Sequence, residues 1–345
     1  MSTRKHHLLS VNGVRIHAVE EGSGPLVVMV HGFPESWYSW RHQLTALAAA
    51  GYRAVAIDQR GYGRSSKFAN TDAYRIHALV GDVVGVVHAL GEKTAVVIGH
   101  DWGAPVAWTA AWLHPEVFTG VIGLSVPFSG RGLIALPGSP FGERHPGELH
   151  AELAGPGQTF YQDYFGAMEA AVNEIESDVR GWLRGALWSL SGAPLKALLP
   201  DFATMDQVAL IRGSAMSIAE GGRMSDRFMQ PETMPAWFTE ADLDVFTNEF
   251  ERSGFVGPLA FYHNLVNDWH DLESQADKPL TPPALFIGGE FDVVTGWGQE
   301  AIARASERMP NYVGTKIFKG SGHWIQQEQP AETNAAILEF LAALK

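Results

Sequence analysis

Three side chains of the 345-residue chain could together form an ester and then hydrolyse it. Asp101 could be a carboxylate nucleophile, and an ester formed on it would need a base-activated water for its hydrolysis. His323 could be that base, with Asp292 orienting its ring. The three residues stand in the strings GHDWG at 99–103, GGEFD at 288–292 and GSGHW at 320–324.

The string around Asp101 has the form of a sharp strand-to-helix turn. An apolar run at 94–98 ends at Gly99, and a helix-length segment follows from Trp102. Glycines on both sides permit a tight turn, which would force Asp101 out at the edge of the sheet, above the N–H donors and positive dipole of the helix. Alternatively, Asp101 only caps that helix. A string this short does not decide between the two interpretations.

His323 and Asp292 each follow an apolar run that we expect to be a strand. The carboxyl ends of parallel strands meet at one edge of a doubly wound sheet, which would bring both side chains to Asp101. The order nucleophile, acid, histidine is that of α/β-hydrolases. Glu290 is an alternative orienting acid, although Asp292 lies further past the strand end. An orienting acid after the fourth apolar run is not expected, because the loop at 125–129 holds no carboxylate. Since the chain has 14 histidines, the alternative for His323 is an ordinary loop residue.

The first apolar run ends in HGFP at 31–34, which could supply an oxyanion hole. The backbone N–H groups of Phe33 and Trp102 would bind the negative charge that develops when water attacks the ester. The Phe33-Pro34 bond is also a candidate cis peptide, since the cis form is rarely accessible except before proline.

Apolar runs alternate with helix-length segments in the first third of the chain. The runs are bounded by turn residues and are typical of strands buried on both faces, at 26–30, 52–57, 94–98 and 117–126. Segments at 37–50, 74–90 and 102–113 predict the helices between them. This alternation predicts a parallel, doubly wound sheet, and residues 6–19 could form a hairpin before it.

The middle of the chain breaks the alternation. Between 128 and 281 there is no clear buried strand, and helices are expected at 160–175, 179–190, 205–219, 241–253 and 258–268. Strands are expected again at 284–287 and 315–318, followed by a helix at 331–344. We therefore predict an α/β core of residues 1–128 and 281–345, interrupted by a helical cap, or lid, of residues 129–280.

The composition of the chain argues against several classes of binding partner and cofactor. The formal net charge of −13 repels phosphate backbones and anionic lipid heads, so we expect neither nucleic acid nor a membrane as a partner. The lack of cysteine excludes thiol nucleophiles and disulfides and, with a polar segment at 1–14, fits a cytoplasmic location. His31, His100 and His323 lack metal-ligand spacing, and GYG at 61–63 lacks the rest of a nucleotide fingerprint, so neither a metal nor a cofactor is expected.

Four strings resemble epoxide hydrolases of the α/β-hydrolase fold, the soluble type found in bacteria and in the hydrolase domain of the mammalian enzyme. They are HGFPESWYSWRHQ at 31–43, DQRGYGRSS at 58–66, GHDWGAPVAW at 99–108 and GHWIQQEQP at 322–330. The resemblance spans nearly the whole chain. It implies an α/β-hydrolase fold with an inserted helical cap, and conversion of a small apolar epoxide to a vicinal diol without a cofactor. The resemblance is also compatible with a homodimer, although no segment of the sequence by itself indicates one.

Two cap strings resemble the ring-opening tyrosine segments of this family. YQDYF at 161–165 implies that role for Tyr161, and GFVGPLAFYHN at 254–264 implies it for Tyr262. An opening epoxide leaves an alkoxide, which two phenol O–H donors can bind and protonate. Without the flanking strings, each would be taken for a packed aromatic. Tyr164, on the same helix face, is the nearest rival to Tyr161.

Four further residues are candidates for the neighbourhood of the substrate. Glu35 could order the water or pass protons, or it could make a simple structural hydrogen bond. Trp40, Trp102 and Phe33 could wall the pocket, although each could equally belong to the core.

Two other functions share parts of this pattern. A haloalkane or haloacetate dehalogenase also uses an Asp nucleophile, and Trp102 could bind halide. However, haloalkane enzymes often have Asn where Phe33 stands, and the haloacetate type has an Arg after the nucleophile, which this sequence lacks. A non-catalytic binding protein of the same fold is the more distant alternative. A site that has lost its activity usually lacks one of its catalytic residues, whereas Asp101, Asp292 and His323 are all present here.

Overall fold

An eight-stranded sheet forms the centre of the core. The computed structural model describes residues 4–199 and 201–344, so the first three residues of the polar N-terminal segment lie outside the described residues. The core strands are β1 (Lys5–Val11), β2 (Val14–Gly22), β3 (Leu26–Val30), β4 (Arg53–Ile57), β5 (Ala95–His100), β6 (Phe118–Leu124), β9 (Ala284–Gly289) and β10 (Tyr312–Phe318). Their order across the sheet is β1-β2-β4-β3-β5-β6-β9-β10. Because only β2 pairs antiparallel, with β1 and β4, the predicted mostly parallel sheet and the N-terminal hairpin are both confirmed.

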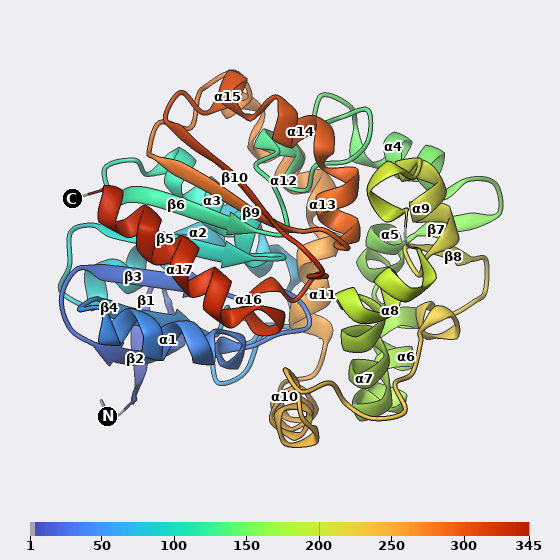
Figure 1. Cartoon of the computed structure of the whole chain (residues 1–345), viewed down its shortest axis with the longest axis horizontal. Coiled ribbons are helices and arrows are strands. Elements are labelled where there is room, and N and C mark those ends of the chain that lie inside the picture. The colour runs from blue at the N-terminus through green and yellow to red at the C-terminus, as the bar shows by residue number, and fades with distance from the viewer. Residues whose placement is uncertain (1–3, 200, 345) are drawn as a thin grey trace.

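Helices cover both faces of this sheet (Figure 1). One face is covered by α1 (Arg41–Ala49), α16 (Ile325–Glu328) and α17 (Pro330–Ala343), and the other by α2 (Ile76–Ala89) and α3 (Gly103–Leu113). Side chains alternate along a strand, so Val27 and Met29 of β3 pack toward α1 and α17 while Val28 and Val30 pack toward α2 and α3. This two-sided burial explains why the strands read as continuous apolar runs. The helices α13 (Val293–Trp297), α14 (Gln299–Ala303) and α15 (Ala305–Arg308) connect β9 to β10.

The segment between β6 and β9, which we call the cap, is predominantly helical and lies beyond the carboxyl ends of the core strands (Figure 1). Both termini lie at the opposite end of the molecule. The cap helices are α4 (Pro146–Ala154), α5 (Tyr161–Gly166), α6 (Glu169–Ser177), α7 (Val179–Ser189), α8 (Gly192–Leu198), α9 (Gln207–Gly213), α10 (Glu240–Ser253), α11 (Val256–His263) and α12 (Leu265–Asp271).

Two expectations for the cap were wrong. The helix expected at 160–175 is broken between α5 and α6 at Met168, whose φ is +65°. The helix expected at 205–219 ends with α9, and the residues after it form β8 (Ser217–Ala219), which pairs antiparallel with β7 (Gln158–Phe160). Strands of three residues are too short to show a periodicity in the sequence. This ladder leads directly into α5, where the Tyr161 N–H donates to the Met216 carbonyl at 2.9 Å.

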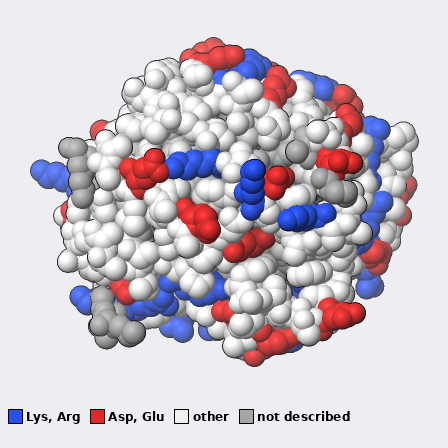
Figure 2. All heavy atoms as spheres, viewed as in Figure 1, with Lys and Arg blue, Asp and Glu red and all other residues white. Residues whose placement is uncertain are grey.

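The surface carries charges of both signs. On the face shown in Figure 2, Lys and Arg side chains alternate with Asp and Glu, and the described residues form no continuous basic stripe there. Within 4–199 and 201–344, none of the helices has both the length and the apolar character needed to cross a bilayer.

Candidate active site

Asp101 lies in a sharp turn between β5 and α3. Its φ of +50° is in the left-handed region, which a non-glycine residue occupies only when its surroundings hold it there. A Cβ on Gly99 would lie 1.9 Å from the Gly103 carbonyl oxygen, and a Cβ on Gly103 would lie 2.0 Å from that of Val30. Because only glycine fits at both positions, strand and helix approach closely and Asp101 projects from the edge of the sheet, as predicted.

The two carboxylate oxygens of Asp101 face different partners. The Phe33 N–H donates to Oδ1 at 2.6 Å, while Oδ2 lies 3.3 Å from His323 Nε2. A Cβ on Gly32 would lie 2.2 Å from Oδ1 and 2.6 Å from the Trp102 nitrogen, so glycine at this position lets the Phe33 loop rest on the turn. The Phe33-Pro34 bond is cis, which confirms that prediction. One oxygen is thus held by a backbone donor and the other by an imidazole.

The other side of the His323 ring is held by two residues. Its Nδ1 lies 3.0 Å from Asp292 Oδ1 and 2.9 Å from the hydroxyl oxygen of Ser125. Asp292 is fully buried, and its second oxygen accepts a hydrogen bond from the Thr295 hydroxyl at 2.8 Å. Both carboxylate oxygens therefore have partners, which fixes the orientation of Asp292 and through it the ring.

Glu290 is turned away from this ring. Its carboxylate accepts the Gly320 N–H at 2.8 Å instead, so the structure favours Asp292 as the orienting acid. Ser125 was missed in the sequence. The loop at 125–129 holds no carboxylate, and the position of Ser125 just after a predicted strand was the one signal for its role.

Neighbouring charges decide whether His323 carries a proton. Burial by itself lowers the pKa of the imidazole, but the charge of Asp292 and the hydrogen bonds to Asp101 and Asp292 raise it to about 10. The ring is therefore an imidazolium at neutral pH, beside the carboxylates of Asp101 and Asp292. The same interaction with His323 holds the pKa of Asp292 below its usual range in spite of burial. An ester on Asp101 would remove one of the two negative charges and lower the pKa of His323.

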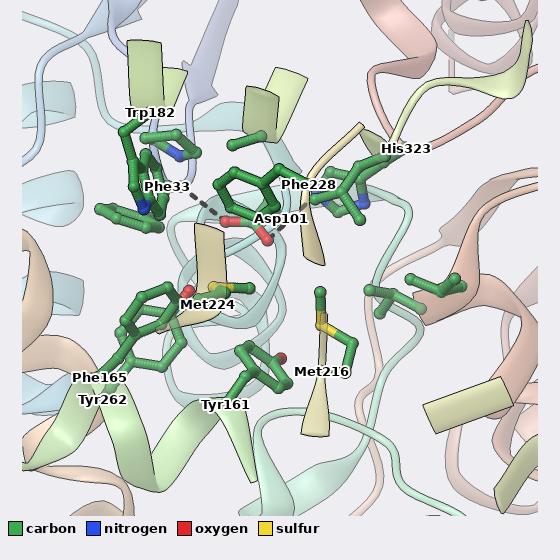
Figure 3. A pocket seen from close by; sticks show the side chains of 15 residues that line it. Phe33, Asp101, Tyr161, Phe165, Trp182, Met216, Met224, Phe228, Tyr262 and His323 are labelled. Carbon is green, nitrogen blue, oxygen red and sulfur yellow. Dashed lines mark hydrogen bonds and ion pairs between the residues drawn. The ribbon is translucent and has the colours of Figure 1, made fainter. Parts of the chain in front are cut away.

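An apolar cavity opens in front of Asp101 and His323, between core and cap (Figure 3). Tyr161 at the start of α5 and Tyr262 on α11 turn toward the same space, with their ring centroids 6.0 Å apart. Burial, with the charge of Asp101 as a further cause, raises the pKa of both phenols, so both hydroxyls remain protonated donors. The rest of the lining consists of Phe33, Pro34, Phe165, Trp182, Ala186, Leu190, Met216, Met224, Phe228, Val293 and Val294.

Tyr164, the rival of Tyr161, points elsewhere. Its hydroxyl donates to the buried carboxylate of Glu174, and it is not among the residues that line the cavity. The geometry therefore favours Tyr161 over Tyr164 as the hydroxyl donor that faces the cavity.

Two tryptophans that were predicted to wall the pocket do not line it. Trp40 is fully buried in the apolar cluster between the sheet and the helices α1 and α17. The Trp102 ring packs edge-on against Phe261 and Tyr262, behind the wall of the cavity. Both side chains serve the core, and only the Phe33 side chain of the predicted apolar residues faces the cavity.

Glu35 also lies outside the cavity lining, as a fully buried link between loops. Its Oε2 accepts the Gly32 N–H at 3.0 Å and lies 2.7 Å from His100 Nδ1, and its Oε1 accepts from Gln326 at 2.9 Å. Burial alone would raise the pKa of Glu35, but the charge and hydrogen bond of His100 lower it to about 2. These contacts favour the structural hydrogen bond over a role in ordering water.

Most of the pocket wall could not be found in the sequence. Phe165, Trp182, Met216, Met224 and Phe228 come from several cap segments, and their only signal was the general abundance of aromatic residues. A second apolar cavity of about 270 Å³ adjoins the first and shares Leu190, Met216 and Val293 with it. Its remaining walls come mainly from α8, α9 and the segments beside them.

The chain is similar throughout its length to known proteins. The family model of the alpha/beta hydrolase fold matches residues 25–167. Epoxide hydrolase B of Mycobacterium tuberculosis is 61% identical over 99% of both chains, and Epoxide hydrolase A of that organism is 38% identical over 100% of this chain and 99% of its own. The solved structure of an epoxide hydrolase from an endophytic Streptomyces superposes with a TM-score of 0.89 at 49% identity, covering 99% of this chain and 96% of its own.

Removing either carboxylate beside His323 should lower the pKa of its ring. We expect both Asp101→Asn and Asp292→Asn to lower it, and Asp292→Asn to do so more, because the Asp292 charge contributes most to the elevation. An NMR titration of the His323 imidazole measures this. Asp163→Asn, which removes the partner of His150, is the control and should leave the His323 titration in place. A His323 pKa that is the same in all three variants as in the parent would contradict the electrostatic account.

Proposed function

The chain belongs to the epoxide hydrolases of the α/β-hydrolase fold, and on that premise we propose how its residues hydrolyse an epoxide to a vicinal diol. The observation that carries the proposal is the common space shared by Asp101, Tyr161 and Tyr262 (Figure 3). It sets a carboxylate opposite two phenol donors, which ring opening requires and which halide displacement does not. The relatives that match over the whole chain support neither the dehalogenase nor the non-catalytic alternative.

The first half-reaction is the attack of Asp101 on an epoxide carbon. The Phe33 N–H holds Oδ1, so Oδ2 is the oxygen free to attack. Tyr161 and Tyr262 bind the ring oxygen and deliver a proton as the C–O bond breaks. The product is a hydroxyalkyl ester of Asp101, and the negative charge passes from the carboxylate to the tyrosine that gave up its proton. The proton that His323 loses when its pKa falls restores that phenol, which leaves a neutral imidazole beside a neutral ester.

The second half-reaction is the hydrolysis of that ester. Once Asp101 is neutral, the pKa of His323 falls and the ring can act as a base, with Asp292 and Ser125 holding its Nδ1. Water activated by Nε2 attacks the Asp101 carbonyl carbon. The oxyanion develops on Oδ1, where the Phe33 N–H already donates, and Trp102 N–H is the second proposed donor. Collapse of this intermediate breaks the ester C–O bond, and the departing alkoxide takes a proton from His323 to become the diol. Asp101 then ionises and returns a proton to His323, which restores the starting state.

We propose that the substrate is a small apolar epoxide. The cavity walls are formed mainly by aromatic, leucine, valine and methionine side chains, and the charged groups of the lining are Asp101 and His323. The adjoining apolar cavity offers room for a further apolar substituent.

Three further properties are proposed: the limits of the cap, the location of the protein and its oligomeric state. We place the limits of the cap at 129 and 280, in the connections that follow β6 and precede β9. A cytoplasmic location is proposed because the chain lacks cysteine. A homodimer is proposed on the family resemblance alone, and sedimentation of the purified protein tests it.

Replacing His323 with Gln should trap the ester. Asp101 and the tyrosines remain, so ring opening proceeds, but no base activates the water. We expect intact-protein mass spectrometry to show an increase equal to the mass of the epoxide, and peptide mapping to place it on Asp101. His114→Gln, at an exposed site, is the matched control and should show no adduct during turnover. Normal turnover by His323→Gln would remove His323 from the role of base.

Replacing both tyrosines with Phe should abolish ring opening. The double variant Tyr161→Phe/Tyr262→Phe keeps the apolar wall and loses both donors, so we expect the rate of ester formation to fall at least about a hundredfold. Rapid-quench measurement of the ester gives this rate. Tyr164→Phe is the control, because its hydroxyl faces Glu174 instead of the cavity, and it should retain ring opening. Unimpaired ester formation in the double variant would return both tyrosines to a packing role.

A further inference from the structure

Glu328, the last residue of α16, binds the backbone on both sides of His323. Its Oε2 accepts the Gly322 N–H at 3.1 Å, and its Oε1 accepts the Trp324 N–H at 3.1 Å. A carboxylate that bridges the two flanking residues restricts the backbone from which the His323 side chain projects.

The same carboxylate reaches the cap. Glu328 Oε2 also accepts the Gly192 N–H at 2.9 Å, at the start of α8. Two neighbouring hydrogen bonds make the same connection between loop and cap. The His323 N–H donates to the Leu190 carbonyl at 2.9 Å, and the Trp324 indole N–H donates to the Leu187 carbonyl at 2.7 Å.

The packing at this junction leaves no room for side chains. A Cβ on Gly192 would lie 2.1 Å from the Gly320 carbonyl oxygen, and a Cβ on Gly322 would lie 2.3 Å from the Gly192 nitrogen. The backbones of loop and cap are therefore in direct contact. Leu190, on the cap side of this contact, also lines the catalytic cavity.

We propose that Glu328 is a positioning residue for His323, which holds the histidine loop against the α7–α8 junction of the cap. The inference rests on the proposed role of His323 as the base of ester hydrolysis. A positioning role for Glu328 should affect the two half-reactions differently. Asp101 is positioned by the turn after β5 and by the Phe33 N–H, and Tyr161 and Tyr262 are positioned by α5 and α11. Ester hydrolysis requires the His323 ring itself, whereas in ring opening this ring is only a neighbour of Asp101 Oδ2, so loss of the junction should slow hydrolysis far more than ring opening.

Glu328→Gln tests the proposal. The amide replaces one acceptor oxygen by an NH2 group, which would face an N–H donor, so at least one of the three backbone bonds is lost. We expect the rate of ester hydrolysis to fall by about a hundredfold, as when a reacting group is displaced by about 1 Å. The rate of ester formation should fall much less, so the ester accumulates during turnover. Rapid quench with intact-protein mass spectrometry measures both steps on the full chain with an aryl epoxide.

Two further variants separate an effect of the cap contact from a general effect of altering this loop. Glu290→Gln is the matched control, because Glu290 also accepts a backbone N–H of this loop, that of Gly320, and this hydrogen bond does not involve the cap. It should leave both rates unchanged. Gly192→Ala disturbs the junction from the cap side and should slow ester hydrolysis as Glu328→Gln does.

The outcomes distinguish failure of the inference from failure of the proposed function. Unchanged ester hydrolysis in Glu328→Gln overturns the positioning role, and so does an equal fall of both rates, which would mark a general loss of structure. An effect of Glu290→Gln as large as that of Glu328→Gln also overturns it, because the cap contact would then be irrelevant. If the parent enzyme and His323→Gln form no ester at all, the proposed function itself fails.

Discussion

The hydrogen bond from the Phe33 N–H to Asp101 Oδ1, 2.6 Å long, is the contact on which the rest of the structure depends. It requires the left-handed backbone of Asp101 and the closeness that glycine permits at positions 32, 99 and 103. Because the bond fixes one carboxylate oxygen, the other is left for attack. Since the acyl group of the ester is the Asp101 side chain itself, the donor that orients the nucleophile also receives the later oxyanion.

A second constraint is the charge shared by three groups. His323 lies between two carboxylates and carries a proton in their presence. Ring opening neutralises one of them, so the chemistry of the first step produces the base needed in the second. The core supplies these charges and the part of the apolar wall formed by Phe33, Pro34, Val293 and Val294, while the cap supplies the phenol donors and the rest of that wall. The cap is also hydrogen-bonded to the histidine loop through Leu187, Leu190 and Gly192, so both parts of the chain determine the site.

The sequence predicted the parts of the site that depend on local patterns. Asp101, Asp292 and His323 could be found because each directly follows an apolar run, and such runs become parallel strands whose ends meet. Tyr161 and Tyr262 came only from the resemblance to the family. Ser125 directly follows β6 and was missed because only a carboxylate was expected to orient the histidine. The cap residues of the pocket wall were missed because their positions depend on how separate cap segments pack. Trp40 was misplaced for a related reason, because burial of an aromatic does not indicate which face of the sheet it covers.

The central claim is that the oxygen added to the epoxide comes first from Asp101. A single turnover in ¹⁸O-labelled water, with enzyme in excess over the epoxide, tests it most directly. The account predicts that the diol of this turnover is unlabelled and that one ¹⁸O is found in the Asp101 carboxylate, because water attacks the ester carbonyl carbon. A labelled diol with an unlabelled Asp101 would show that water attacks the epoxide directly, and would contradict the covalent mechanism.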